Sequence, residues 1–401
     1  MRFSLTSAHH RVGAAPAAKQ GRMSIAHLAF LLLFPGFFFY QTLLGLGKIP
    51  GFLGGYFSEI VAIFIFPLVI VYARKMKGFR LTSRIDLYFA IFIAYFIFVI
   101  CLNFLGGANI TTVLNHLRAI GYYVTLFIIF KTINLEHQLF KVSVVFSLIA
   151  MAVIIFSFSI DGTFYLATQN LARDGDSVAT YQGFSRSFFI TLAVIVSVIK
   201  LPSHRAIIYC VAGPALYVNG ARSEFVALLF MLPFIEIYRS KRKLHTFALI
   251  VSIVAIAAVN FELIVSALPT NRMLELLDLS QSTSANARQQ LSLLAIDTIV
   301  ANPLLGDYAS YTPGDYAHNV LSAWVDLGLF GFIFLLALLV LPALSLIPRG
   351  LFGATASNEA LLAFCLLSVT IFLLLTSHNF ADMTTGAALG MFSNYRSRRQ
   401  P

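Results

Sequence analysis

Long runs of apolar residues constrain the fold of this chain more than any other feature. Runs of about 17–25 apolar residues are long enough to cross the hydrocarbon core of a bilayer as α-helices. Eleven such runs occur, and a twelfth is shorter and rich in Gly, Ala and Thr. The predicted spans are residues 24–46, 55–73, 86–104, 119–135, 139–160, 184–200, 205–221, 223–238, 245–266, 318–347, 359–377 and 381–395.

The composition agrees with a membrane-embedded chain. With 59% hydrophobic and 11% charged residues, it falls far below the roughly 25% charged content of soluble domains. We therefore predict an all-α, polytopic integral membrane protein of about twelve transmembrane helices. In this prediction residues 23–395 form a single transmembrane domain between flexible cytoplasmic tails at 1–22 and 396–401.

The positions of Lys and Arg indicate which loops face the cytoplasm, because basic residues avoid translocated loops. If the N-terminus is cytoplasmic and the twelve spans alternate, 21 of the 28 Lys and Arg residues lie on the cytoplasmic side. The net charge of +11 then follows from topology and does not predict a nucleic-acid partner. We expect a multi-pass protein of the bacterial inner membrane with both termini in the cytoplasm.

Two of the external, periplasmic loops are long, at residues 161–183 and 267–317. The second contains residues 285–301, in which four residues from Leu291 to Thr298 recur with helical spacing. Such spacing places them on one face of a helix. We predict an amphipathic helix that lies against the outer surface.

Seven basic residues remain on the external side, and six of them are Arg. They are Lys48, Arg118, Arg173, Arg186, Arg222, Arg272 and Arg288. The planar guanidinium can hold two phosphate oxygens at once. An external face that keeps Arg against the charge bias therefore predicts an anion-binding site, although each single Arg also fits an ordinary contact with lipid headgroups.

A polar stretch at residues 302–332 leads from the second long loop into the next span. It places His318, followed by Asn319, at the external water boundary, where an imidazole can exchange protons. Asp326 lies deeper, and its carboxylate should face the protein interior because charge is costly in lipid. We predict that His318 and Asp326 are catalytic. Helix capping by His318 and a structural hydrogen bond by Asp326 are the alternatives.

Further external turns carry charged or titratable residues. In residues 219–224 (NGARSE), Arg222 and Glu224 either neutralise each other or hold and orient a phosphate. His378, in residues 377–382 (SHNFAD), is either structural or part of the site. The predicted pyrophosphate contacts are Arg222, Arg288, Arg186 and Arg118, and the predicted supporting residues are Glu224, Asn319 and His378.

The sequence offers no zinc-binding or redox motif. It has no HExxH motif, and all three cysteines lie inside apolar runs. We therefore expect no metal, disulfide or other cofactor. The expected site is metal-independent: arginines stabilise charge on a leaving pyrophosphate, and a histidine accepts a proton from an attacking hydroxyl.

At these residues the sequence resembles the O-antigen ligase and O-antigen polymerase superfamily of bacterial envelope proteins. Residues 303–306 (PLLG) and 317–331 (AHNVLSAWVDLGLFG) are similar to the family's signature of PLLG, His-Asn and an acidic residue followed by two glycines. Residues 219–224 resemble an Arg-containing family turn, and Arg288 lies where the family has an Arg before the large-loop helix. Residues 182–188 (QGFSRSF) are similar to a third family turn but lack its Asn-Pro-Asn.

The resemblance implies a GT-C-like fold and an inverting, metal-independent glycosyl transfer at the external face. It also implies that His318 activates the acceptor, that Arg222 and Arg288 bind the pyrophosphate, and that Asp326 supports them. The expected partners are an undecaprenyl-pyrophosphate-linked glycan donor, a glycan or lipid A–core acceptor, and membrane lipids.

Two kinds of enzyme share this donor site. A polymerase transfers the growing chain to another lipid-linked repeat, and a ligase transfers it to lipid A–core or to a protein. We slightly favour a polymerase because polymerases are numerous and diverge freely. A transporter or flippase is the alternative from another class, but it predicts internal repeats and polar residues near the bilayer midplane. Here the polar residues cluster at one face.

Overall fold

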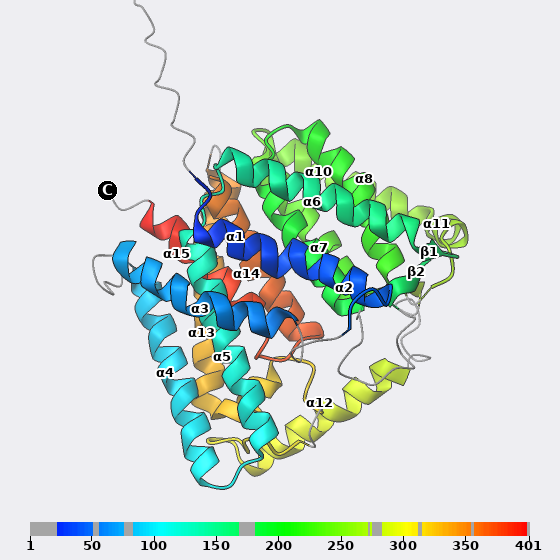
Figure 1. The fold of residues 1–401 in the computed structure, drawn as a ribbon. Helices are drawn as coiled ribbons and strands as arrows, with labels where there is room; N and C mark the ends of the chain where they lie inside the picture. The colour runs from blue at the N-terminus through cyan, green and yellow to red at the C-terminus, as the bar shows by residue number, and fades with distance from the viewer. Residues whose placement is uncertain are drawn as a thin grey trace, which may run out of the picture.

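The computed structural model describes the helical body of the chain (Figure 1). The described residues are 22–50, 56–75, 83–167, 181–271, 273–274, 283–311, 315–353 and 357–398. They are almost entirely helical, as predicted. The strands among them form one small antiparallel hairpin, β1 (Ser159–Ile160) and β2 (Thr163–Phe164).

Each of the twelve predicted spans coincides with a helix or a run of helices. These are α1–η1–α2 (Ile25–Leu31, Leu32–Gly36, Phe37–Gly45), α3 (Tyr56–Lys75), α4 (Arg84–Leu105), α5 (Ile110–Thr132), α6 (Gln138–Ser157), α7 (Tyr181–Val198), α8 (Pro202–Asn219), α9 (Arg222–Arg239), α10 with α11 (Lys243–Val259, Phe261–Ala267), α13 (Leu321–Phe352), α14 (Asn358–Thr376) and α15 (Thr384–Ser397). The helix predicted in the large loop is α12 (Thr283–Ala301).

Six helices of the described chain are long and apolar enough to cross a membrane, namely Ile25–Gly45, Arg84–Leu105, Ile110–Thr132, Gln138–Ser157, Leu321–Pro348 and Asn358–Thr376. A seventh is gained if α10 and α11, which meet at an angle of 73°, count as one span. Large apolar side chains on the outside, such as Phe66, Phe98 and Phe146, fit a surface that faces lipid. The chain is thus a membrane protein with several spanning helices, and the count of twelve spans is not confirmed.

One end of the bundle gathers ion pairs, and we call it the ion-pair end. Lys131 Nζ, at the end of α5, lies 2.5 Å from Asp86 Oδ2, at the start of α4. Arg205 Nη2, at the start of α8, lies 2.6 Å from Glu236 Oε2, near the end of α9. Two further pairs at this end are Arg398 with Glu359 and Lys141 with Glu136. Starts and ends of successive helices meet here, so these helices run alternately up and down.

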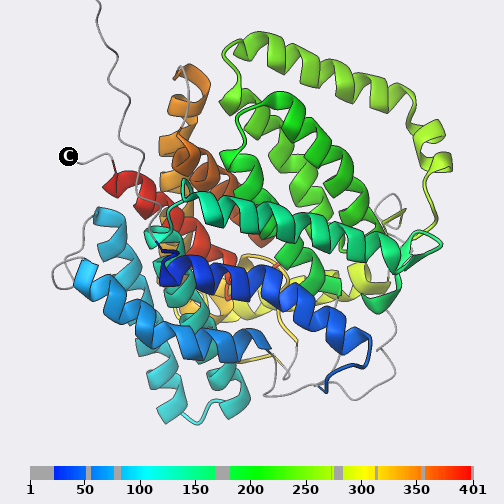
Figure 2. The same ribbon diagram turned by 45° about the horizontal axis from the view of Figure 1, so that its top comes forward.

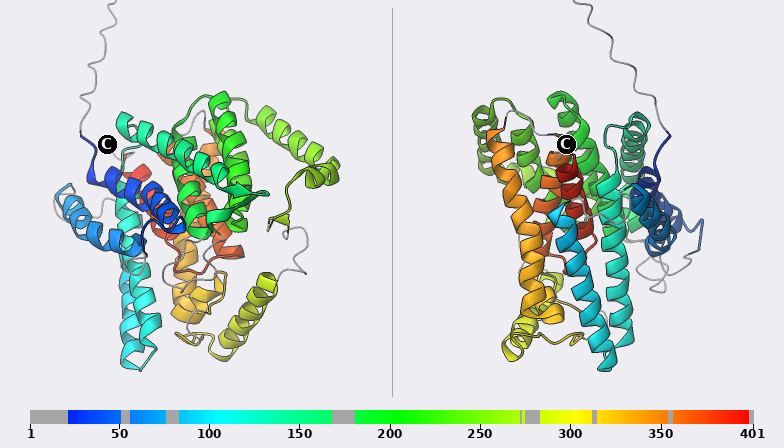
Figure 3. Two further views of the ribbon diagram at one scale, coloured as in Figure 1. Left: turned by 45° about the vertical axis from the view of Figure 1, so that its right-hand side comes forward. Right: turned by 90° about the vertical axis from the view of Figure 1, so that its left-hand side faces the viewer.

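The opposite end of the bundle holds α12 and the loop between α14 and α15. Figure 3 shows α4, α5 and α13 running side by side, with α12 at the end away from the last turn of α15. Figure 2 shows α10 and α11 on the rim of the molecule, and neither helix has a buried residue.

The Gly- and Ala-rich twelfth segment is an interior helix. Residues 384–395 of α15 are all buried, and the helix packs against α5. A Cβ on Gly386 would lie 2.4 Å from the carbonyl oxygen of Tyr123, and one on Gly390 would lie 2.3 Å from that of Phe127. Small residues let the two backbones approach, which explains why this segment is less apolar than the lipid-facing spans.

Two predicted details differ from the structure. The fourth span was predicted to begin at residue 119, but α5 begins at Ile110 and includes the polar residues before that point. On α12, Leu294 is 48% exposed and Ile299 is buried, so the buried face is rotated from the predicted one because α12 packs on the start of α13.

Several sequence predictions lie outside the described residues. In the two predicted tails they are residues 1–21 and 399–401. In the first long loop they are residues 168–180, which include Arg173. In the second they are residue 272, which is Arg272, and residues 275–282 and 312–314. Within the described part of that tail, α15 continues to Ser397.

Candidate functional site

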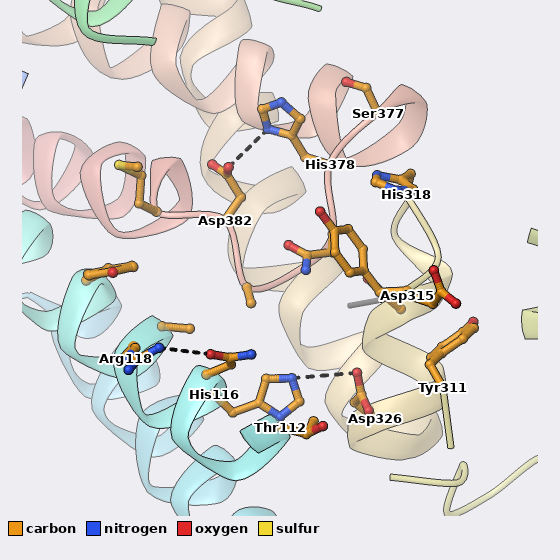
Figure 4. Close-up of a pocket in the computed structure, with 18 of the residues that line it drawn as sticks. Thr112, His116, Arg118, Tyr311, Asp315, His318, Asp326, Ser377, His378 and Asp382 are labelled. Carbon is orange, nitrogen blue, oxygen red and sulfur yellow. Dashed lines mark hydrogen bonds and ion pairs between the residues drawn. The ribbon is translucent and has the colours of Figure 1, made fainter. Parts of the chain in front are cut away.

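A polar cavity of about 530 Å³ opens at the end of the bundle opposite the ion-pair end. Its walls come from the first turns of α3, α5, α7 and α9, from α12, and from the loops that precede α13 and α15. The predicted site residues that line it are Arg118, Arg186, Arg288, His318, Asp326 and His378. Figure 4 labels Arg118, His318, Asp326 and His378 among them. Six residues that are far apart in sequence therefore meet around one space.

The wall formed by α13 depends on a break in that helix. Gly328 has a φ of 68° and a ψ of 179°, which is not helical, and Gly306 has a φ of 69°. The loop before α13 hydrogen-bonds to the opened backbone: Asp307 N donates to Val325 O at 2.8 Å, and Leu329 N donates to Leu304 O at 3.0 Å. Both glycines adopt a left-handed conformation that disfavours side chains.

The same break positions Asp326 beside the loop. Its Oδ1 accepts a hydrogen bond from Ala309 N at 3.0 Å, and its Oδ2 lies 3.8 Å from His116 Nε2 on α5. His116 Nδ1 is in turn 2.9 Å from the Tyr308 hydroxyl. Asp326 is only 7% exposed, and Ala309 N and His116 are polar neighbours of its buried carboxyl group. The dashed line between His116 and Asp326 in Figure 4 marks the pair.

His318 lies in the loop before α13, half-buried at the cavity wall. Burial and the nearby Arg288 guanidinium lower its pKa below the ordinary value of 6.5, while a hydrogen bond to the Ser377 backbone acts in the opposite direction. The imidazole is therefore neutral at pH 7. A neutral ring that donates one N–H to a carbonyl keeps its other nitrogen as an acceptor. His318 thus has the protonation state that a general base requires.

Arg186 is held by the loop between α14 and α15. Its Nη2 lies 3.0 Å from Asp382 Oδ2, and its Nε lies 3.9 Å from Glu224 Oε1. Asp382 Oδ2 is also 3.1 Å from His378 Nδ1, which Figure 4 marks with a dashed line. About a quarter of the Arg186 side chain remains exposed toward the cavity. The guanidinium is therefore oriented by acidic residues and still accessible to an anion.

Arg288 and Arg118 approach the cavity from α12 and α5. Asn319 links α12 to the start of α13, because its Nδ2 donates to Ser292 Oγ at 3.0 Å. Arg118 is exposed, and its Nη1 donates to Asn115 Oδ1 at 3.2 Å. The predicted supporting residue Asn319 thus acts on the placement of Arg288 and is not one of the lining residues.

Arg222 and Glu224 differ from the prediction in their relation to the cavity. Within the described turn 219–224, Ser223 lines the cavity, whereas Arg222 begins α9 beside it and is not a lining residue. Glu224 is buried, accepts a hydrogen bond from Ser223 Oγ at 2.7 Å, and faces Arg186. Glu224, on α9, therefore orients Arg186, an arginine of the site that belongs to α7.

The sequence reasoning did not select three residues that the structure adds to the site. They are His116, Tyr308 and Asp382. Asp382 was visible as the last residue of the SHNFAD turn, and His116 as a neighbour of Arg118. Tyr308 gave no signal, because its contact with His116 spans 192 positions of the sequence.

In comparisons with known proteins, no family model matches this chain and no curated protein matches it. Among the described residues there is no group of three or more His, Cys, Asp or Glu side chains that could hold a metal ion. Asp174 and Asp176, whose spacing suits two carboxylates that share a divalent cation, lie outside the described residues. A metal-independent site stays a prediction.

Proposed function

We propose that this protein is a glycosyltransferase of the bacterial inner membrane that acts on a glycan linked to undecaprenyl pyrophosphate. The observation that carries the proposal is the single cavity at which His318, Arg288, Arg186 and Arg118 meet. A neutral imidazole beside several guanidinium groups suits a reaction in which a hydroxyl attacks and a pyrophosphate leaves. We slightly favour a polymerase of surface polysaccharide over a ligase.

The proposed reaction forms one glycosidic bond and breaks the bond between the anomeric carbon of the donor sugar and an oxygen of the pyrophosphate. The acceptor hydroxyl attacks the anomeric carbon of the donor sugar from the face opposite the pyrophosphate, so the configuration inverts. His318 takes the hydroxyl proton. The electron pair of the broken carbon–oxygen bond leaves with undecaprenyl pyrophosphate, whose oxygens Arg288 and Arg186 stabilise.

The proposed orientation places the cavity on the periplasmic side. It completes the twelve-span topology, with both termini in the cytoplasm and the ion-pair end in contact with the cytoplasm. The excess of Lys and Arg that the positive-inside rule expects supports this orientation, since Lys131, Arg205 and Arg398 all belong to the ion-pair end.

Complementation of a deletion strain tests the proposal. His318→Ala is expected to abolish restoration of the host's surface polysaccharide on a gel, and Arg288→Ala is expected to reduce it strongly. His245→Ala and Arg242→Ala are matched controls, because both side chains are exposed at the start of α10 on the rim. Equal amounts of each variant in the membrane must be shown by immunoblot. Polysaccharide of normal length and attachment with both cavity variants would contradict the proposal.

The same gel separates the remaining candidates. Loss of a polymerase leaves lipid A–core carrying a single repeat, whereas loss of a ligase leaves long chains on undecaprenyl pyrophosphate. Loss of a transporter or flippase leaves single lipid-linked repeats on the cytoplasmic face. The enzyme reading is favoured because most of the lining residues lie at the starts of helices and in the loops at the end of the bundle beside α12.

A further inference from the structure

A second cavity, of about 680 Å³, lies near the ion-pair end between α4, α13 and α15. We call it the α4–α13–α15 groove. Its lining residues are Ser83, Arg84, Ile85, Tyr88, Phe334, Ala337, Leu338, Leu341, Pro342, Ser345, Phe392 and Arg396. None of them belongs to the polar cavity, so the groove requires its own explanation.

The lining of the groove changes from apolar to cationic along its length. Arg84 is the first residue of α4, and Arg396 is one residue from the end of α15. Phe392 lies one turn deeper than Arg396, and Phe334 lies deeper still on α13. From Phe334 to Ser345 the helix rises roughly 16 Å, close to half of a hydrocarbon core of about 30 Å. The groove therefore has the length and polarity of one leaflet.

The two arginines of the groove have no acidic partner within the described chain. Both Arg84 and Arg396 are exposed, whereas the neighbouring Arg398 has its Nη1 2.6 Å from Glu359 Oε1. Lys131, near the same end, is likewise paired with Asp86. Within the described chain, no carboxylate balances the two positive charges of the groove, unlike those of Arg398 and Lys131. An anion would complement these two charges.

We propose that the α4–α13–α15 groove binds one anionic phospholipid of the leaflet at the ion-pair end. Its phosphate lies between the Arg84 and Arg396 guanidinium groups, which hold phosphate oxygens in a fork. An acyl chain follows Leu341, Leu338 and Phe334 toward the middle of the bilayer. Basic pockets between transmembrane helices are known to take anionic lipid headgroups in this way.

Native mass spectrometry of the purified full-length protein tests the assignment. The protein is mixed with phosphatidylglycerol or with phosphatidylethanolamine of the same acyl chains, and the retained lipid is counted. We expect one phosphatidylglycerol to be retained in preference to phosphatidylethanolamine. The double variant Arg84→Gln/Arg396→Gln is expected to lose about thirtyfold in affinity for phosphatidylglycerol, from the loss of two charges near the headgroup. Glycerol 3-phosphate, which lacks acyl chains, should not displace the lipid.

Two further variants make the test decisive. Ala337→Trp fills the groove without changing charge and should reduce retention of phosphatidylglycerol. Arg74→Gln/Arg242→Gln removes two exposed charges outside the groove and should retain the lipid as the wild type does. Equal retention of the two lipids by the wild type, or wild-type retention by either groove variant, would overturn the proposal. If the Arg84→Gln/Arg396→Gln protein does not fold, the Ala337→Trp variant and the glycerol 3-phosphate competition decide.

Discussion

Asp382 uses its two carboxylate oxygens for different contacts. Oδ1 accepts hydrogen bonds from the Thr384 backbone and hydroxyl, at 2.9 and 2.6 Å, and so caps the start of α15. Oδ2 contacts Arg186 and His378. One buried residue therefore fixes a helix start and an arginine of the cavity, which makes Asp382 a positioning residue and not a catalytic one.

Asp382→Asn should separate these two roles. The amide oxygen can still cap α15, but it no longer balances the charge of Arg186. We expect glycosyl transfer to fall about 100-fold through a misplaced guanidinium, mainly as a higher KM for the lipid-linked donor. The loss of stability should be below about 3 kcal/mol because Arg186 is partly solvated. Asp297→Asn, on the exposed side of α12, is the control. An unchanged KM would exclude this role.

The lowered pKa of His318 predicts the pH dependence of the reaction. The neutral imidazole is the active form, so kcat/KM should be near its plateau at neutral pH and should fall as the pH decreases through the lowered pKa. Because the charge of Arg288 contributes to the lowering, Arg288→Gln should move this acid limb to higher pH, and Arg288→Lys should not. A pH–rate profile of each purified variant measures this. An acid limb at the same pH in Arg288→Gln as in the wild type would contradict the effect of the Arg288 charge on the pKa of His318.

At the scale of elements, the broken start of α13 is the feature on which the site depends most. A Cβ on Gly306 would lie 2.3 Å from Val325 O, and one on Gly328 would lie 2.6 Å from Leu304 O. Two of the three glycines of the PLLG…DLGLFG motif, Gly306 and Gly328, therefore serve one loop-to-helix contact. That contact brings Asp326 and Ala309 together at the cavity wall.

Gly306→Ala should destabilise the protein by roughly 2 kcal/mol or more, from the left-handed backbone and the steric overlap together. The melting temperature in detergent should decrease, and transfer activity should decrease with it. Gly213→Ala is the matched control, because a Cβ there meets no atom within 4 Å. That control should be neutral or slightly stabilising. Equal melting temperatures for Gly306→Ala and Gly213→Ala would show that the contact is not important.

Hydropathy predicted where the helices lie, but it did not predict where α5 begins or that α13 is broken. The start of α5 was not predicted, because Asn115, His116 and Arg118 have the polarity of a loop, whereas they lie on a helix that faces the polar cavity. The break at Gly328 was not predicted, because a glycine in a spanning segment also fits close packing of an unbroken helix. Such a break depends on a partner loop more than twenty residues away, which hydropathy does not reveal.

At the scale of the whole molecule, the alternation of helices predicts which residues share a side of the membrane. Lys48 and Lys241 are both exposed and belong to opposite sides of the proposed topology. In a cysteine-free background, a membrane-impermeant maleimide should label Lys48→Cys in cells with an intact inner membrane. It should label Lys241→Cys only after that membrane is opened. The reverse pattern would invert the proposed orientation.

The candidate site was predictable only in part, because the packing of the helices decides which residues meet. The sequence predicted a site among the charged residues on the external side of the topology, and Arg186, Arg288 and His318 do line one cavity. It did not predict which of these residues lie next to one another. Arg222 was selected but is not a lining residue, while Asp382 was passed over because it was placed in a span. These assignments depend on helix packing, which a single sequence does not specify.

The most direct test of the proposed function is glycosyl transfer by the purified protein in a membrane-mimetic environment. Wild-type protein is incubated with an undecaprenyl-pyrophosphate-linked repeat of the host's surface polysaccharide, with the lipid A–core acceptor added in a parallel reaction. Free undecaprenyl pyrophosphate and the glycan products are quantified by mass spectrometry. We predict release of undecaprenyl pyrophosphate together with a longer or a core-attached glycan, and neither product with His318→Ala. A lipid-linked glycan left intact in both reactions by folded wild-type protein would contradict the assignment.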